Sequence, residues 1–155
     1  HFLLTNELLP LIEKSTEGRI VNVSSIAHQN ASLDFDNLNA EKKFSGYSAY
    51  SISKLANVLF SKELAERLKF TSITSNSLHP GVITTKLLTA GFNMSGASIK
   101  KGAETSVYLA SSPEVKNISG EYFVDKKILR YHSIVDDSIS RKKFWDLSVE
   151  MTSGI

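Results

Sequence analysis

The sequence predicts an α/β fold, namely the C-terminal half of a doubly wound parallel sheet with about three strands and four helices. Helical and strand patterns alternate along the 155 residues, as they do where right-handed crossovers join parallel strands. The first candidate strand, Ile20–Val23, is the short β-branched run expected of a strand covered on both faces. That strand would be an open edge in so small a sheet, so we expect an upstream strand beside it.

Two helices and one strand are expected in the first half of the chain, bounded by turn formers and a polar loop over residues 30–44. The predicted elements are a helix over residues 1–12 with its apolar side chains at Leu4, Leu8, Leu11 and Ile12, a strand over residues 20–23, and a long helix from about Gly46 to Phe70 with its apolar stripe at Ile52, Leu55, Ala56, Leu59, Leu64 and Leu68. Within the long helix, Glu63 and Arg67 form a favourable i,i+4 pair.

The second half continues the alternation, with turn formers, caps and prolines at the boundaries. The predicted elements are a strand over residues 71–79, a mobile loop over residues 84–97, a helix from Ile99 that stops at Pro113, a strand over residues 121–124, and a last helix that begins at Asp137 or Ser138 and carries Phe144, Trp145, Leu147 and Met151. Pro80 and Gly81 form the turn that ends the second strand.

Composition excludes several classes of function. The chain has no cysteine, which excludes disulfides and thiolate metal sites, and its histidines lack metal-ligand spacing. The net charge is +2 with scattered basic pairs, so we predict no nucleic-acid interface. No apolar run approaches the roughly 18 residues that cross a bilayer. Four Asn-x-Ser sequons occur, but Asn22 lies in a predicted buried strand and nothing else indicates secretion, so we interpret them as chance. The compartment stays open: cytoplasmic or organelle-associated, but not secreted.

Three residues carry the chemistry that the sequence predicts. Ser25 follows the first strand, at the carboxyl end where parallel sheets bind ligands. Tyr50 and Lys54 are four residues apart on the long helix, so their side chains share one face. An ammonium beside a phenol favours the phenolate, and such a tyrosine can move a proton to or from an alcohol oxygen. We therefore predict a nicotinamide-dependent oxidoreductase with Ser25, Tyr50 and Lys54 as catalytic residues.

Each of these signals also has a simpler interpretation. A lone Tyr-x-x-x-Lys is common on exposed helices, and Ser-Ser after a strand is usually a turn or a cap. Tyr47 competes with Tyr50 from one turn earlier, but the residue four positions on is Ser51, which cannot stabilise a phenolate. The order of strand, serine, loop, helix, strand and Pro80-Gly81 turn is what favours the oxidoreductase.

These motifs, in this order, resemble those of the short-chain dehydrogenase/reductase family across nearly the whole chain. The motifs are Ile20-Val-Asn-Val-Ser-Ser25, Tyr50-x-x-x-Lys54 and Leu78-His-Pro-Gly81. The chain is most similar to the branch that holds retinol dehydrogenases, a WW-domain oxidoreductase and a chloroplast-envelope dehydrogenase, through residues 2–6, 53–60, 119–123 and 144–148. The resemblance implies a Rossmann-type fold.

The resemblance also implies a role for each motif residue. Ser25 would orient the substrate oxygen, Tyr50 would be the acid/base, and Lys54 would lower the tyrosine pKa and bind the nicotinamide ribose. The implied cofactor-binding residues are Tyr50, Lys54, Pro80, Gly81, Ile83 and Thr85, with the Pro80-Gly81 turn under the nicotinamide and residues 83 and 85 at its carboxamide. His79 would pack beside this turn, and no metal is implied. NADP is the expected cofactor, with NAD as the alternative.

Several parts of the family pattern have no counterpart in this sequence, among them the glycine-rich phosphate loop. Gly91 and Gly96 have the spacing of a phosphate loop, but Ala97 stands where a lysine is required, so we interpret them as part of a flexible, substrate-admitting loop. The chain also begins inside a helix at His1. We therefore expect residues 1–155 to be the C-terminal part of a single dinucleotide-binding oxidoreductase domain, inactive without its N-terminal cofactor-binding half.

The predicted function is the NAD(P)-dependent interconversion of an alcohol and an aldehyde or ketone on an apolar substrate that is retinoid-, steroid- or lipid-like. The alternative is a non-catalytic or regulatory binding protein that keeps the same fold. The resemblance also implies a homodimer face on the first helix and the Tyr50 helix. The sequence leaves the substrate, the reaction direction and the choice between NAD and NADP open.

Overall fold

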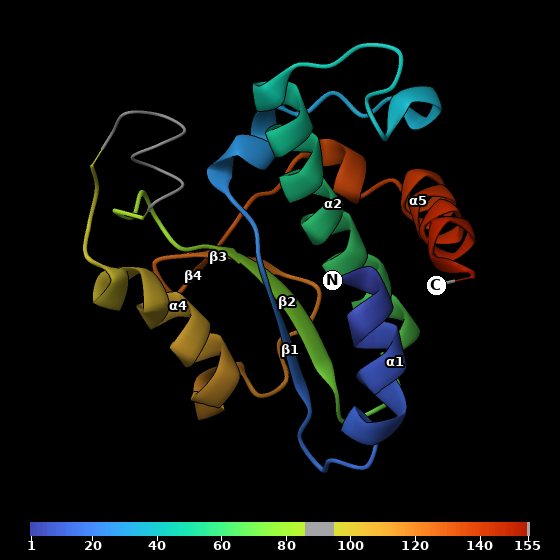
Figure 1. The fold of residues 1–155 in the computed structure, drawn as a ribbon. Coiled ribbons are helices and arrows are strands. Elements are labelled where there is room, and N and C mark those ends of the chain that lie inside the picture. Colours follow the sequence, from blue (N-terminus) through green and yellow to red (C-terminus); the bar gives the residue numbers. More distant parts are fainter. Residues whose placement is uncertain (86–94, 155) are drawn as a thin grey trace.

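The computed structural model describes residues 1–85 and 95–154 and forms a central sheet flanked by helices (Figure 1). Its helices and strands are α1 (Phe2–Ile12), β1 (Arg19–Val23), α2 (Gly46–Arg67), β2 (Thr74–His79), α4 (Ile99–Ser111), β3 (Tyr122–Val124), β4 (Lys127–Leu129) and α5 (Ser138–Thr152). Short 3-10 turns at Ile26–Asn30 (η1), Phe35–Asn37 (η2), Pro113–Val115 (η3) and Ser133–Val135 (η4) join them. The predicted α/β fold is confirmed, whereas most of the loop predicted to be mobile lies outside the described residues.

The sheet has the strand order β1-β2-β3-β4. The first three strands are parallel, and their register aligns Val23 with Leu78 and Leu78 with Phe123. The carboxyl ends of β1 and β2 therefore lie side by side, and the segments that begin at Ser24 and Pro80 leave the sheet at the same edge. Any side chains that follow these two strands are brought to one place.

The fourth strand, β4, was not predicted. It pairs antiparallel with β3, and Asp125 and Lys126 form the two-residue turn between them, both with positive φ (46° and 64°). Positive φ at both positions is the conformation of a type I′ hairpin turn, for which Asn-Gly and Asp-Gly are the usual signal. A lysine at the second position hides that signal.

Helices cover both faces of the sheet. Helix α2 packs on β1 and β2 from one side and α4 from the other, while α5 lies against α2 and α1 (Figure 1). Asp137 caps α5 by accepting hydrogen bonds from the backbone N–H groups of Ile139 and Ser140, so of the two predicted alternatives, Asp137 and Ser138, the first is the cap. Within residues 1–85 and 95–154, none of the helices combines the length and apolar character that crossing a bilayer requires.

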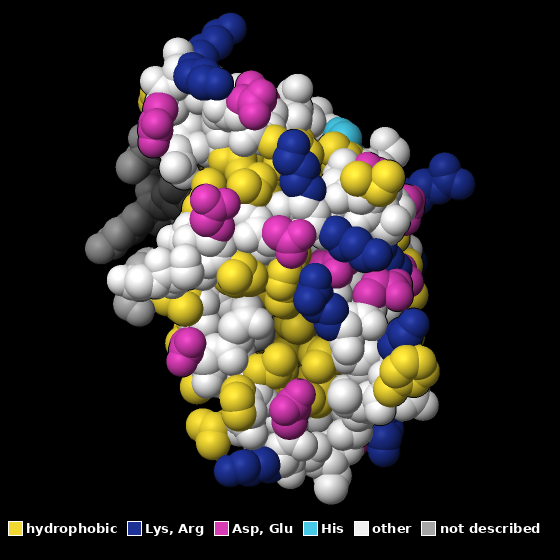
Figure 2. All heavy atoms as spheres, turned by 90° about the vertical axis from the view of Figure 1, so that its right-hand side faces the viewer, with side chains coloured by type: hydrophobic (Ala, Val, Ile, Leu, Met, Phe, Trp, Pro, Cys, Tyr) yellow, Lys and Arg dark blue, Asp and Glu magenta, His cyan; other side chains and the backbone are white. Residues whose placement is uncertain are grey.

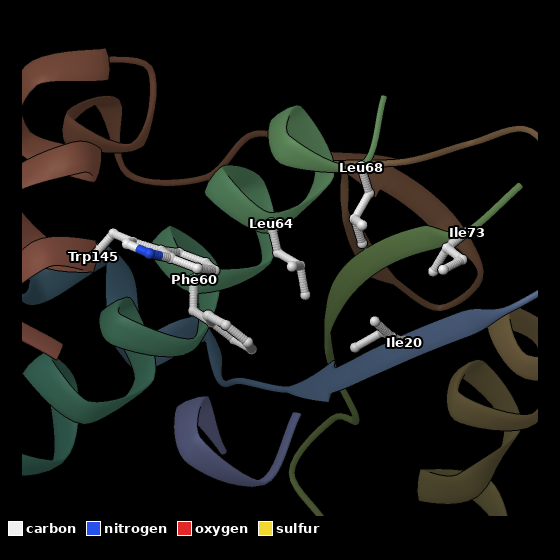
Figure 3. Packing of buried hydrophobic residues seen from close by; sticks show 6 residues of the cluster. All are labelled: Ile20, Phe60, Leu64, Leu68, Ile73 and Trp145. Atoms are coloured by element: carbon white, nitrogen blue, oxygen red, sulfur yellow. The ribbon is translucent and has the colours of Figure 1, made fainter. Parts of the chain in front are cut away.

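The apolar stripe of α2 supplies much of the core. Leu55, Leu59, Leu64 and Leu68 of that stripe are buried, as predicted. One core cluster, in which Phe60 and Leu64 meet Ile20 of β1 and Trp145 of α5, is shown in Figure 3. Because β1 and α5 both contribute to it, this cluster joins the sheet to the C-terminal helix through α2.

The face with which helix α1 packs shares only Ile12 with the predicted one. Phe2, Leu9 and Ile12 pack against the core, whereas Leu4 and Leu11 are about two-thirds exposed, at 65% and 61%. The side of the molecule that includes α1 and α5 accordingly shows a band of apolar side chains between acidic and basic ones (Figure 2). The leucine spacing identified the helix correctly but not its buried face.

Trp145 fixes α5 to the helices beneath it. Its ring stacks on Phe60 at 5.8 Å between centroids and meets the edge of Phe2 at 4.9 Å. The Arg67 guanidinium lies 4.1 Å from the Trp145 ring centroid, a distance at which a cation is attracted to the face of the ring. The C-terminal helix is therefore anchored by one buried aromatic side chain.

Glu63 is a buried carboxylate with two cationic partners. Its side chain accepts hydrogen bonds from Arg67 Nε at 3.0 Å and from Arg141 Nε at 3.4 Å, so the predicted i,i+4 pair with Arg67 is confirmed. Arg141 is itself buried and also donates to the carbonyl of Val135 at 2.6 Å. Breaking one partner of such a buried pair leaves an uncompensated charge, which is strongly destabilising.

Replacing Glu63 with Gln should therefore lower the free energy of unfolding by about 3 kcal/mol, measured by urea unfolding of the protein that contains this chain. Glu66→Gln is the matched control, because Glu66 is exposed on the same helix and its substitution should change stability by less than about 0.5 kcal/mol. Equal stability of the two variants would contradict the assignment.

Candidate active site

A cavity of about 330 Å³ opens at the carboxyl ends of β1 and β2. It is lined by Val23, Ser24, Ser25, Ile26, Ala27, Tyr47, Tyr50, Lys54, His79, Pro80, Gly81, Val82, Ile83 and Thr85. All seven residues that the sequence predicted for the site line this one cavity, although they come from three separate segments. Most of the remaining lining side chains are apolar.

The end of β1 is tied to α2 by polar contacts. Ser24 Oγ donates to the carbonyl of Lys54 at 2.6 Å, and Asn57 Nδ2 donates to the carbonyl of Val23 at 3.1 Å. The Lys54 ammonium is 3.4 Å from the same Val23 carbonyl. One turn further along, Ser61 Oγ accepts a hydrogen bond from the buried side chain of Asn22 at 2.8 Å. These contacts hold the Lys54 turn of the helix directly beside the strand end.

Ser25 presents its hydroxyl group in a defined orientation. Its side chain caps η1, with Oγ accepting a hydrogen bond from the backbone N–H of Ala27 at 3.2 Å. A hydroxyl group has one donor and two acceptor positions, so this contact uses an acceptor position and leaves the O–H available as a donor. Ser25 can therefore donate a hydrogen bond to an oxygen atom placed in the cavity.

Tyr50 and Lys54 share a face of α2, as their spacing predicts. The Lys54 ammonium lies 5.8 Å from the centroid of the Tyr50 ring, and both side chains are half-buried. Burial lowers the pKa of the Lys54 ammonium, because removal from water penalises its charged form. A partly desolvated cation interacts more strongly with negative charge than one in water, so it can stabilise a phenolate that forms at Tyr50.

Tyr47, the competitor of Tyr50, lines the same cavity from one turn earlier. It is half exposed, and its hydroxyl accepts a hydrogen bond from Asn30 Nδ2 at 2.9 Å. Ser51, four residues further on, is fully buried. Four residues after Tyr47 the helix thus has a buried serine, whereas four residues after Tyr50 it has Lys54, whose ammonium lies near the Tyr50 ring.

The Pro80-Gly81 turn and the segment after it form another part of the cavity wall. Gly81 has φ of +98°, a conformation that residues with a side chain rarely adopt. Beyond it, Ile83 pairs with Ala97 in an isolated parallel bridge, and Ala97 N–H donates to the Val82 carbonyl at 2.8 Å. The segment that carries Ile83 and Thr85 is therefore held in place by residues 96–97.

Gly96 has a packing role that the phosphate-loop spacing did not indicate. A Cβ atom on Gly96 would lie 2.0 Å from the Val82 carbonyl oxygen, far inside contact distance. Gly96 N–H and its carbonyl both bond to the Thr84 hydroxyl, at 2.8 and 2.9 Å. Gly96 lets two backbones touch, whereas Gly91 lies outside the described residues.

Two histidines near the site were not predicted to take part in it. His79, expected to pack beside the turn, lines the cavity, and its Nδ1 atom is buried without a hydrogen-bond partner among the described residues. His28 is fully buried behind Ser25, and its Nδ1 lies 2.6 Å from the Ser25 carbonyl. Its other ring nitrogen, Nε2, accepts a hydrogen bond from the backbone N–H of His132, 104 positions away. No local pattern in the sequence could therefore identify the place of His28 in the site.

Comparison with known proteins identifies relatives of this arrangement. A family model described as "short chain dehydrogenase" matches residues 1–96. The chain is 46% identical to human retinol dehydrogenase 14 (Homo sapiens), over 97% of this chain and 49% of that protein. It is 37% identical to the chloroplastic short-chain dehydrogenase TIC 32 A of Brassica napus, over 100% of this chain and 55% of that protein.

A solved structure agrees with these relatives. The crystal structure of an uncharacterised protein from Mycobacterium paratuberculosis superposes with a TM-score of 0.78 at 30% identity, covering 98% of this chain and 55% of that one. The chain spans about half the length of the curated relatives that it matches.

Gly96→Ala should displace the segment over residues 82–84 and destabilise the protein by about 1–3 kcal/mol, the usual range for overpacking. Gly46→Ala is the control, since no atom lies within 4 Å of the added methyl group and alanine favours a helix. Thermal unfolding of the two variants measures the difference, and a Gly96→Ala variant as stable as wild type would contradict the close approach.

Stability should also depend on the protonation of His28. Burial lowers the pKa of His28 below its ordinary 6.5. At pH values between the lowered pKa and 6.5, the unfolded chain therefore binds more protons than the folded one. The contribution of His28 to the free energy of unfolding is therefore fully present above about pH 6.5 and is lost as the pH falls below that value. Urea unfolding measures the free energy of unfolding at about pH 7.5 and about pH 5.5, and its change between these two pH values should be smaller for His28→Asn than for wild type. Equal changes in the two proteins would exclude His28 as a source of the pH dependence.

Proposed function

This chain belongs to the short-chain dehydrogenase family, and from that we propose that its protein is an NAD(P)-dependent oxidoreductase that interconverts an alcohol and an aldehyde or ketone. The observation that carries the proposal is the cavity that Ser25, Tyr50 and Lys54 line together, with the Lys54 ammonium 5.8 Å from the Tyr50 ring centroid. Two isolated motifs on an exposed helix and a turn would not share a cavity.

Tyr50 would be the group that moves the proton. In carbonyl reduction its hydroxyl donates a proton to the substrate oxygen, and in alcohol oxidation the phenolate accepts one. Lys54 would stabilise the phenolate by its charge, and the Ser25 O–H would hold the substrate oxygen within reach of Tyr50. A bound nicotinamide would accept or supply the hydride at the substrate carbon.

The cavity residues fit the nicotinamide end of a dinucleotide. An ammonium has three donors, and the hydrogen bond of Lys54 to Val23 uses one of them, so donors remain for ribose hydroxyls. The positive φ of Gly81 turns the backbone across the cavity wall, where the backbone of Ile83 and the hydroxyl of Thr85 would meet the carboxamide. We propose NADP as the cofactor, with NAD as the alternative, on the basis of the family resemblance.

The pyrophosphate would be bound by a different part of the protein. We propose that residues 1–155 form the C-terminal part of a single dinucleotide-binding domain, and that the phosphate-binding loop belongs to an N-terminal half. Two features support this division: the relatives are about twice as long as the region matched, and among the described residues β1 pairs on one side only, with β2. The open edge of β1 presents unpaired backbone N–H and C=O groups with which a further strand can pair.

An apolar substrate is proposed from the cavity lining. Val23, Ile26, Val82 and Ile83 line the cavity together with Ser25 and Tyr50, which suits a molecule with one polar reacting group and a hydrocarbon body. The 46% identity to a retinol dehydrogenase supports the same class. We therefore propose a retinoid-, steroid- or lipid-like aldehyde, ketone or alcohol.

The homodimer implied by the family resemblance stays a prediction. In this chain α5 already packs against α1 and α2, through Trp145 and its contacts with Phe2 and Phe60. A second copy would therefore have to bind the parts of α1 and α2 that α5 leaves uncovered.

Tyr50→Phe removes the proton-transferring hydroxyl and should lower kcat by roughly 10²–10⁴-fold, the usual contribution of a general acid–base, while leaving cofactor affinity largely intact. Steady-state oxidation of NADPH with a panel of apolar aldehydes measures kcat, and fluorescence titration measures cofactor affinity, both in the full-length protein.

Tyr47→Phe is the matched control, since it removes the same atom from the same cavity one turn earlier and should keep most of the activity. Near-normal turnover by Tyr50→Phe would exclude the mechanism. Cofactor binding without any turnover by the wild-type protein would instead favour the binding or regulatory protein that the sequence left as the alternative.

A further inference from the structure

His28 is a buried polar group next to the proposed substrate-binding serine. It lies in η1, three residues after Ser25, and its side chain has no exposed surface. Its ring meets the edge of Tyr122, a core residue of β3, with 4.6 Å between centroids. A buried imidazole that only filled space would leave its nitrogens without partners at a substantial cost, but both nitrogens of His28 are paired.

The two partners determine the tautomer of His28. The Ser25 carbonyl can only accept a hydrogen bond, so Nδ1, at 2.6 Å, carries the proton. Nε2 is then the unprotonated nitrogen and accepts a hydrogen bond from the backbone N–H of His132 at 3.3 Å. The neutral ring thus joins the backbone of Ser25, just after β1, to the backbone of His132, just before η4.

The contacts of Ser25 show what this link does. The Ser25 carbonyl accepts from the backbone N–H of His28 at 3.1 Å as well as from the ring, and Ser25 Oγ accepts from the N–H of Ala27. The peptide unit after Ser25 is therefore held by the His28 side chain together with the His28 backbone N–H, and the Ala27 N–H that orients the Ser25 hydroxyl belongs to the same turn. Gln29 adds a separate bond from η1 to the carbonyl of Arg130, at 2.8 Å.

We propose that His28 is a positioning residue: the Nδ1–H of its neutral imidazole holds the Ser25 carbonyl, and so keeps the Ser25 hydroxyl directed at the substrate oxygen. The proposal rests on the proposed function, because it assigns His28 a part in catalysis only through Ser25. His28 itself touches neither substrate nor cofactor. The groups that face its ring are the backbone of Ser25 and His132 and the ring of Tyr122. The titratable side chains whose charge acts on the ring are His132 and His79.

Two substitutions separate the bonds that His28 makes. The amide nitrogen of asparagine can occupy the place of Nδ1, whereas the longer glutamine places its amide near Nε2. His28→Asn should therefore keep the bond to Ser25, and His28→Gln should lose it. Gln29→Ala is the control, because it removes a bond between η1 and the same distant segment without touching Ser25.

The experiment measures kcat, KM and the NADPH dissociation constant of the full-length protein and these variants with an apolar aldehyde. We expect His28→Gln to lower kcat by roughly 10–100-fold, since an ångström of misplacement has effects of that order. KM and cofactor affinity should stay within a few-fold, and His28→Asn and Gln29→Ala should keep kcat near that of wild type.

A second readout is independent of turnover. Hydrogen exchange of the Ala27 amide, which bonds to Ser25 Oγ, should be faster in His28→Gln than in Gln29→Ala or His28→Asn. A wild-type protein that turns over no alcohol or carbonyl would contradict the proposed function alone, and the Ala27 exchange rates would then decide the positioning role.

Unchanged kcat and unchanged Ala27 exchange in His28→Gln would overturn the proposal. An equal loss in His28→Asn and His28→Gln would also overturn it, since only one of them loses the bond to Ser25. If His28→Gln does not fold, His28→Ala, which also lacks a donor to the Ser25 carbonyl, is compared with His28→Asn in the same two measurements, and equal values for these two variants would exclude the role.

Discussion

The attachment of α2 to the carboxyl end of β1 is the interaction on which the site depends. Asn57 and Lys54 both bond to the carbonyl of Val23, and Ser24 bonds back to the carbonyl of Lys54. A strand end has backbone groups that no neighbouring strand satisfies, and buried groups of this kind need partners. Here helix α2 supplies these partners. Because Tyr50 lies one turn before Lys54, the same contacts bring the Tyr50 phenol close to the segment that begins at Ser24.

The rest of the chain stabilises this arrangement from residues far away in sequence. Trp145 fixes α5 on α2 through Phe60 and the Arg67 cation, while Glu63 holds the buried Arg141 of the same C-terminal helix. In another part of the cavity wall, Gly96 allows residues 96–97 to touch the backbone after Gly81. The cavity thus depends on packing at three places outside its own lining.

Local signals were sufficient for much of the fold. The short apolar strand before Ser25, the leucine stripe of α2 and the Asp137 cap of α5 each gave the correct element, because periodicity and capping reflect interactions within a few residues. Signals failed where the deciding contact was distant or unusual. Helix α1 packs with Phe2, Leu9 and Ile12 rather than with its exposed leucines, and the Asp125-Lys126 turn gave no sign of β4.

The sequence by itself determined the fold class, the order of the elements and the seven residues expected at the site, because each was encoded in a short pattern that chemistry or family resemblance can interpret. Only the tertiary structure decided that these seven line one cavity, that Gly96 is a packing glycine, and that His28 connects Ser25 with His132. The physical reason is that these contacts join segments up to about a hundred residues apart, and which side chains meet there is set by the parallel strand register and helix packing rather than by any local spacing.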